Sequence, residues 1–127
     1  MRYTKLTIDH FINPRNAGAI SDAGGIGFTD NLGCGDFVKI FIKVKDDVIK
    51  DVRFQAFGCA ATIAVGSMVT EMAKGRSLNE AQTISDEAVA EALGGLPPEK
   101  VHCSNLAATA LHKAIEDYRE KASMPRD

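Results

Sequence analysis

The stretch that decides the fold is FVKIFIKVK at residues 37–45, in which apolar side chains alternate with lysines. This period of two predicts a strand with one buried face. After a turn at Asp46-Asp47, residues 52–56 repeat the alternation, which predicts an antiparallel hairpin. Residues 25–29 predict a weaker first strand, and the lysine side of the hairpin is interpreted as a solvated face. The apolar side then needs a cover.

Helices predicted in the rest of the chain provide that cover. Residues 60–74 are apolar nearly all round, which is typical of a buried helix, and residues 103–121 have a clear apolar stripe. Shorter helices are predicted at residues 3–12, after Ser77 and over 85–93. Residues 123–127 are expected to fray. The sum is an α+β fold in one domain, residues 1–127, with a small antiparallel sheet of about three strands covered on one face by helices.

Composition excludes several classes of function. The net charge is -2, and no apolar run reaches the roughly 18 residues of a membrane-spanning helix. We therefore expect a cytoplasmic protein that binds neither nucleic acid nor membrane. In that compartment three cysteines favour reduced thiols with a function over a disulfide framework.

Three cysteines are the candidate functional residues. Cys34, Cys59 and Cys103 are separated by 24 and 43 residues, too far for a zinc knuckle or a redox pair, so only tertiary folding can bring them together. Glycines or polar residues flank each one. The alternative is that they are small buried apolar residues.

Each cysteine has a neighbour that favours metal binding. Asp36 follows Cys34 by two residues, so on extended backbone the two point the same way. Cys59 and Cys103 each begin a predicted helix, where the helix dipole lowers a thiol pKa, and His102 adds an imidazole. Three sulfurs with a replaceable fourth ligand, Asp36 or His102, suit a transition metal or an iron–sulfur cluster that is released again. Three further residues are interpreted from the sequence alone: Lys100 is a candidate neighbour of the site, whereas His10, on the polar side of the first helix opposite Leu6 and Phe11, and His112 are expected to be exposed.

Several motifs in order make the chain similar to a known family. DHFINPRN at 9–16, CGD at 34–36, GCAA at 58–61 and LPPEKVHCS at 96–104 resemble the iron–sulfur cluster assembly scaffold family of the IscU and NifU N-terminal type. The resemblance covers almost the whole chain. It implies a scaffold and carrier, not an enzyme.

The resemblance also implies a ligand set and partners. A cysteine desulfurase would deliver sulfur as a persulfide on Cys103, and iron would join it. A [2Fe–2S] cluster would assemble on Cys34, Cys59 and Cys103, with Asp36 or His102 as fourth ligand, and pass to apo-proteins. Zinc could occupy the same site. Assembly on a monomer or a homodimer stays open.

One departure from the family pattern bears on these expectations. Glu99 stands where the chaperone-binding segment commonly has valine, so a dedicated chaperone is an open question. The alternative function is a zinc-containing sulfur acceptor. Against it, the gap between Cys59 and Cys103 leaves no room for the insertion of the SufU-type relatives.

Overall fold

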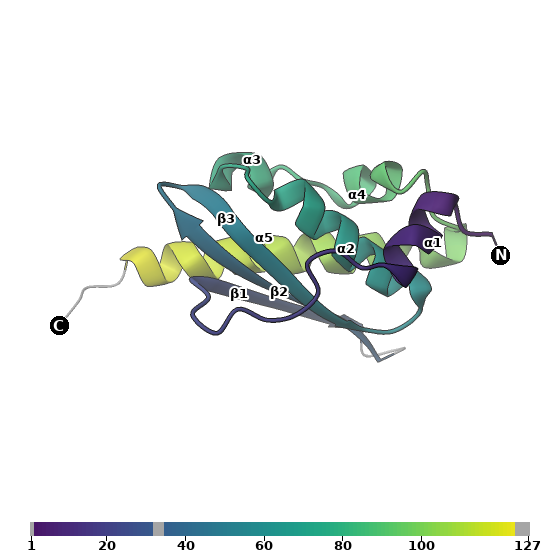
Figure 1. Cartoon of the computed structure of the whole chain (residues 1–127), viewed down its shortest axis with the longest axis horizontal. Helices are drawn as coiled ribbons and strands as arrows, with labels where there is room; N and C mark the ends of the chain where they lie inside the picture. Colours follow the sequence, from purple (N-terminus) through teal and green to yellow (C-terminus); the bar gives the residue numbers. More distant parts are fainter. Residues whose placement is uncertain (1, 32–34, 124–127) are drawn as a thin grey trace.

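A three-stranded antiparallel sheet forms one layer of the protein. The computed structural model describes residues 2–31 and 35–123. The strands β1 (Gly25–Asn31), β2 (Asp36–Lys45) and β3 (Val48–Phe57) lie in the order β1-β2-β3 (Figure 1). Asp46 and Asp47 make the tight turn between β2 and β3 with positive φ angles of 54° and 61°. The predicted α+β fold with its hairpin and weaker first strand is confirmed.

Helices form the second layer. They are α1 (Lys5–Ile12), α2 (Ala60–Ala73), α3 (Leu78–Gln82), α4 (Asp86–Ala92) and α5 (Val101–Ser123), with a 3₁₀ turn (Pro98–Lys100) leading into α5. The predicted caps are present. The Ser77 hydroxyl accepts from the Glu80 N–H at 3.1 Å, the Glu80 carboxylate accepts from the Ser77 N–H at 3.2 Å, and the Ser85 hydroxyl accepts from the Ala88 N–H. No helix in the described ranges is long and apolar enough to cross a membrane.

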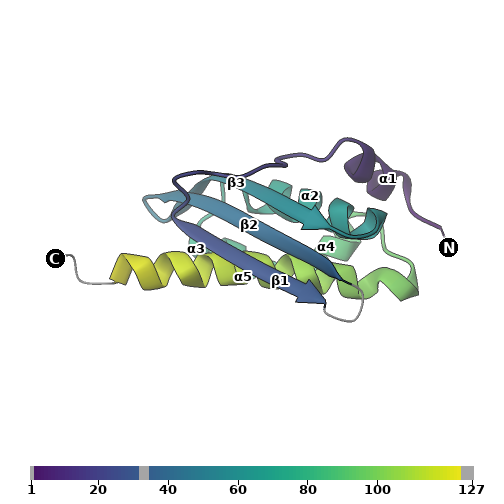
Figure 2. The ribbon, with the colours of Figure 1, turned by 90° about the horizontal axis from the view of Figure 1, so that it is seen from below.

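The core lies between the sheet and the helices α2 and α5. The inner residues of the hairpin are almost fully buried, as the alternation predicted: Val38, Ile40, Ile42, Val52 and Phe54. Helix α5 runs close along β1 because the strand has glycine where the two backbones meet (Figure 2). A Cβ at Gly27 would lie 2.0 Å from the Ala110 carbonyl oxygen. Glycine at this position therefore sets the distance between β1 and α5.

In Figure 2 no helix covers the outer face of the sheet. This face carries aromatic residues in addition to the expected lysines. Phe28, Phe37 and Phe57, one from each strand, form a row with ring centroids 5.6 and 6.1 Å apart. Phe28 and Phe57 are 47% and 64% exposed. This face is therefore part basic and part aromatic.

Helix α1 packs against α2 with the face opposite to the one that the sequence predicted to be buried. His10 is buried and its Nδ1 lies 2.7 Å from the Ser67 hydroxyl of α2, whereas Leu6 and Phe11 are half exposed. The expectation that His10 is exposed was wrong because α2 offers a polar partner at this contact. His112 is also not free, since its Nε2–H donates to the Ile84 carbonyl at 2.8 Å.

Burial of His10 predicts acid-sensitive stability. Burial, with help from Arg15, lowers the pKa of His10 against the opposing charges of Asp9 and Glu71. The folded state therefore favours the neutral imidazole. This contribution to stability is complete above the unfolded pKa of about 6.5 and is lost as the pH falls through it towards the lower folded pKa. We expect the free energy of unfolding, measured in urea, to fall between pH 7 and 5.

The matched variant for this prediction is His10→Asn, whose side-chain amide keeps a polar atom near Ser67 without titrating. We expect a flatter dependence on pH than in the unaltered protein. An equal decline in both proteins would assign the acid sensitivity to other groups.

Candidate metal site

Three side chains that the sequence singled out lie together at one end of the sheet. Asp36 begins β2, Cys59 is the N-cap of α2, and Cys103 lies in the first turn of α5. One ligand atom from each lies within 4.8 Å of the other two. The path of the backbone explains the meeting, since β3 ends beside the start of β2 and both helices begin at this end. Cys34 lies outside the described residues.

Gly58 allows the carboxylate to approach the second cysteine. It has φ +151°, a conformation that side chains disfavour. A Cβ there would lie 2.7 Å from Asp36 Cγ and 2.8 Å from Thr62 Oγ1. The glycine before Cys59 is thus needed both for its own backbone and for the space that Asp36 occupies.

Thr62 connects the three groups and was missed in the sequence. Its Oγ1–H donates to Asp36 Oδ2 at 2.8 Å, and the same oxygen lies 3.5 Å from Cys59 Sγ and 3.6 Å from Cys103 Sγ. The side chain is fully buried. The available signal was its spacing, because a residue three positions after a helix-capping cysteine lies on the same side of the first turn.

Of the two cysteines in the described residues, Cys59 is the one that ionises more readily. Burial alone would raise its pKa, but hydrogen bonds from the Thr62 hydroxyl and from the Thr62 and Ala61 N–H groups, together with the charge of Lys100, hold the pKa below its ordinary value. The expected effect of a helix N-terminus is therefore found at Cys59.

Cys103 behaves in the opposite way. Burial raises the pKa of its thiol to about 11, and the charges of Cys59 and Asp36 add to this effect against the hydrogen bond from Thr62. The expectation that the N-terminus of a helix lowers the pKa of Cys103 was wrong. Proline suits the first position of a helical turn, and a 3₁₀ turn begins at Pro98. Helix α5 therefore begins at Val101, before Cys103, and Cys103 lies on its buried side.

Three further side chains lie near Cys59 and Cys103, those of Tyr3, Lys100 and His102. The negative charge of Cys59 raises the pKa of Lys100, which places this lysine beside the site as the sequence suggested. His102 Nε2 lies 3.7 Å from Cys103 Sγ and its side chain is exposed. Burial raises the pKa of Tyr3, and the charges of Cys59, Lys100 and Cys103 also act on it, so this residue lies close to the site without having been singled out.

The backbone before Asp36 is not extended. Gly35 has φ +77° and its N–H donates to the Asn31 carbonyl at 2.8 Å. Extended backbone, from which Cys34 and Asp36 were expected to point the same way, is therefore not present at Gly35, and Cys34 itself lies outside the described residues.

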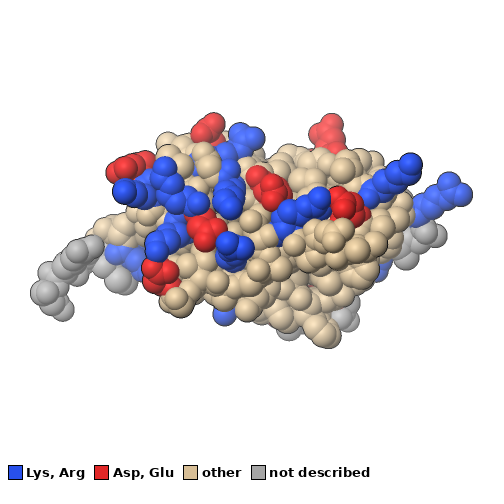
Figure 3. Space-filling model, in the orientation of Figure 1, with Lys and Arg blue, Asp and Glu red and all other residues tan. Residues whose placement is uncertain are grey.

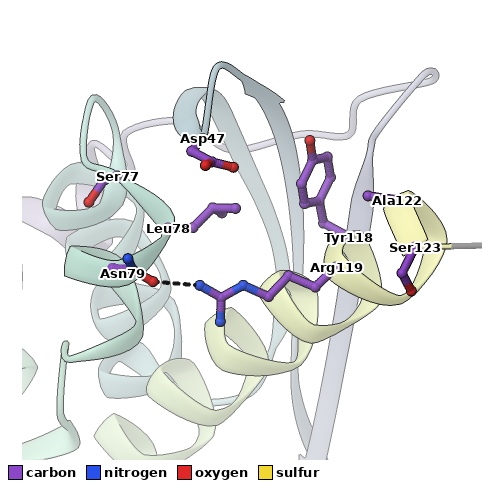
Figure 4. Close-up of a pocket in the computed structure, with 8 residues that line it drawn as sticks. All are labelled: Asp47, Ser77, Leu78, Asn79, Tyr118, Arg119, Ala122 and Ser123. Atoms are coloured by element: carbon purple, nitrogen blue, oxygen red, sulfur yellow. Dashed lines mark hydrogen bonds between the residues drawn. The ribbon is translucent and has the colours of Figure 1, made fainter.

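A cavity at the other end of the sheet from Cys59 and Cys103 has different chemistry. A cavity of about 350 Å³ lies between the β2–β3 turn, the start of α3 and the end of α5 (Figure 4). Arg119 crosses it and donates to Asn79 Oδ1 at 2.8 Å. It is lined by Asp47, Ser77, Leu78, Asn79, Tyr118, Arg119, Ala122 and Ser123. No sulfur or imidazole lines it, so it lacks the soft ligands that a thiophilic metal needs.

Charges are mixed on the face of the protein that includes this end. Lys and Arg side chains gather over the end with the β2–β3 turn and α3, and Asp and Glu side chains lie among them (Figure 3). Lys43 and Asp22 form an exposed ion pair at 2.5 Å. The positive charge on this face is therefore broken up by acidic residues.

Together the fold and the site define a small α+β protein with a buried cluster of cysteine and carboxylate groups where β2, α2 and α5 begin. The chain belongs to the family described as NifU-like N terminal domain, which matches residues 2–125. The resemblance seen in the sequence is thus confirmed.

Two relatives of known name support the same assignment. The iron–sulfur cluster assembly scaffold protein IscU 1 of Archaeoglobus fulgidus is 60% identical over 119 residues, which cover 94% of this chain and 78% of that protein. The scaffold protein IscU of Escherichia coli K12 is 46% identical over 125 residues, covering 95% of this chain and 97% of the other.

Solved structures share the fold. A structure from Fervidobacterium islandicum, described as an iron–sulfur cluster assembly scaffold for the SUF system, has a TM-score of 0.74 and 25% identity, covering 89% of this chain and 96% of that one. The N-terminal part of a NifU-like protein from Brucella abortus has a TM-score of 0.75 at 19% identity, covering 93% and 94%, which supports the fold alone.

Proposed function

We propose that this protein is a scaffold on which a [2Fe–2S] cluster is assembled and from which it passes to apo-proteins. The observation that carries the proposal is the convergence of Asp36, Cys59 and Cys103 within 4.8 Å, in a chain 60% identical to a protein named as an iron–sulfur cluster assembly scaffold. The cluster is cargo, so the site must both bind and release it.

The donor set fits that cargo. Thiolates are the usual ligands of iron–sulfur clusters, and a carboxylate is a harder, weaker partner for such iron. A site of this kind holds a cluster less firmly than four thiolates do. In this proposal Cys34 supplies the third sulfur from the segment just before β2.

Asp36 is the preferred fourth ligand in this proposal. It already lies beside both described sulfurs and is buried. His102 is exposed and its Nε2 is 3.7 Å from Cys103 Sγ. In this proposal His102 replaces Asp36 during release, from the solvent side of the site.

Sulfur delivery requires Cys103 to be accessible and ionised. A cysteine desulfurase would present a persulfide, and the Cys103 thiolate would attack its outer sulfur. A new S–S bond forms, the old one breaks, and its electron pair leaves on the desulfurase thiolate. Because Cys103 is fully buried with a pKa of about 11, the first turn of α5 must open before this step.

The second candidate function is a zinc-containing sulfur acceptor. It is favoured by the same donors, since two sulfurs and a carboxylate oxygen also suit tetrahedral zinc. Zinc would then stay in the protein, and sulfur instead of a cluster would be passed on.

Anaerobic reconstitution separates the two functions. With ferrous iron, cysteine, a desulfurase and a thiol reductant that reduces the persulfide sulfur to sulfide, we expect a coloured protein with equal iron and sulfide that yields its cluster to an apo-ferredoxin. A zinc-loaded protein that refuses iron but accepts labelled sulfur would support the second function. Binding of neither metal would contradict both.

A further inference from the structure

Thr62 occupies the centre of the metal site without being a ligand type that thiophilic metals use. Its Oγ1 lies 2.8 Å from Asp36 Oδ2, 3.5 Å from Cys59 Sγ and 3.6 Å from Cys103 Sγ. The side chain has no exposed surface. One hydroxyl therefore contacts all three gathered ligand groups.

A threonine inside a helix ordinarily returns its hydroxyl to a nearby backbone carbonyl. Thr70, two turns later in α2, does so with the Ser67 carbonyl at 2.6 Å and is equally buried. The hydrogen bonds described for the Thr62 hydroxyl go to Asp36 and the two cysteines instead. Helix formation does not explain this choice of partners.

We propose that Thr62 is a positioning residue of the site: its hydroxyl holds the Asp36 carboxylate beside Cys59 and Cys103 and so sets how tightly the site binds a thiophilic divalent ion. The inference rests on the proposed function, because it takes these three groups as ligands.

The geometry gives the mechanism. A carboxylate has two oxygens, and the Thr62 O–H holds Oδ2, which leaves Oδ1 for an ion. Gly58 leaves the space in which the carboxylate and the hydroxyl meet, and among the described residues the Thr62 hydroxyl is the side chain that holds Oδ2. Outer partners of this kind change metal affinity about 10–100-fold.

The test is anaerobic titration with Co²⁺ and Zn²⁺ against a competing chelator. Thr62→Val removes the hydroxyl at constant volume, and we expect about 10–100-fold weaker binding, with a Co²⁺ spectrum shifted towards that of Asp36→Ala. Thr62→Ser keeps a hydroxyl at this position. Its affinity is expected to lie within about threefold of the unaltered protein, well short of the loss expected for Thr62→Val. If Thr62→Val does not fold in the metal-free state, Thr62→Ala makes the same comparison.

A double-mutant cycle separates positioning from general packing. In the Asp36→Ala background Thr62→Val is expected to cost no further affinity, whereas a merely structural effect would be the same in both backgrounds. Thr70→Val is the matched control and should leave affinity unchanged. Equal affinity and spectra for Thr62→Val and the unaltered protein would overturn this inference alone. Failure of the unaltered protein to bind either ion would overturn the proposed function.

Discussion

Replacement of Cys103 by serine is expected to abolish stable binding of thiophilic metal. Cys103 Sγ is one of the three gathered ligand atoms, and α5 places it at a buried position that solvent ligands do not easily reach. Loss of a direct ligand should cost more than the roughly 100-fold that an outer partner can cost. The measurement is Co²⁺ affinity under anaerobic conditions, with the sulfur-to-cobalt charge-transfer band as the signature.

The control for Cys103→Ser lies in the same helical turn. Ser104 is also buried, but its hydroxyl donates to the Val101 carbonyl at 2.7 Å and has no hydrogen bond to Asp36, Cys59 or Cys103. Ser104→Ala should keep full affinity, and metal-free melting curves should show that both variants fold. A Cys103→Ser protein that retained one equivalent of Co²⁺ with an unchanged band would remove Cys103 from the ligand set.

Of the substitutions proposed for this protein, Gly27→Ala is expected to lower the free energy of unfolding most. The new Cβ would lie 2.0 Å from the Ala110 carbonyl oxygen and 2.4 Å from the Ala114 nitrogen. Both atoms are backbone, so β1 and α5 must separate. Overpacking commonly costs about 1–3 kcal/mol, and we expect the upper end or more, against a total stability of about 5–15 kcal/mol.

The measurement for Gly27→Ala is the free energy of unfolding in urea. A fall of about 3 kcal/mol corresponds to roughly 10 °C in melting temperature for a chain of this size. Gly24→Ala is the matched control, because its Cβ would first meet the Tyr118 ring at 3.1 Å, and a side chain can move. Equal stability of the two variants would show that the β1–α5 distance is not set by Gly27.

The sheet and most helices were predictable because their signals are local. Alternation of Val38, Ile40 and Ile42 with polar residues can be satisfied only by a strand with one buried face, and the structure has it. The Ser77 capping box likewise needs only four consecutive residues. The order of the cysteine motifs gave the family, which the comparisons confirmed.

The errors were at contacts between elements. His10 was assigned to the exposed side of α1 because histidine is polar, but the Ser67 hydroxyl on α2 makes burial acceptable. Cys103 was expected to ionise easily because it begins a helix, but the 3₁₀ turn from Pro98 moves it into the core. For His10 the deciding partner lies on another helix, and for Cys103 burial in the folded protein raises the pKa of the thiol.

The sequence by itself determined the alternating strands, the helix caps and the turns at glycine, because each depends on neighbours a few residues away. Tertiary structure alone decided that Asp36, Cys59 and Cys103 meet, that Thr62 lies between them, and that the pKa values of the two thiols are shifted in opposite directions. The physical reason is that burial and through-space charge depend on which distant segments pack together.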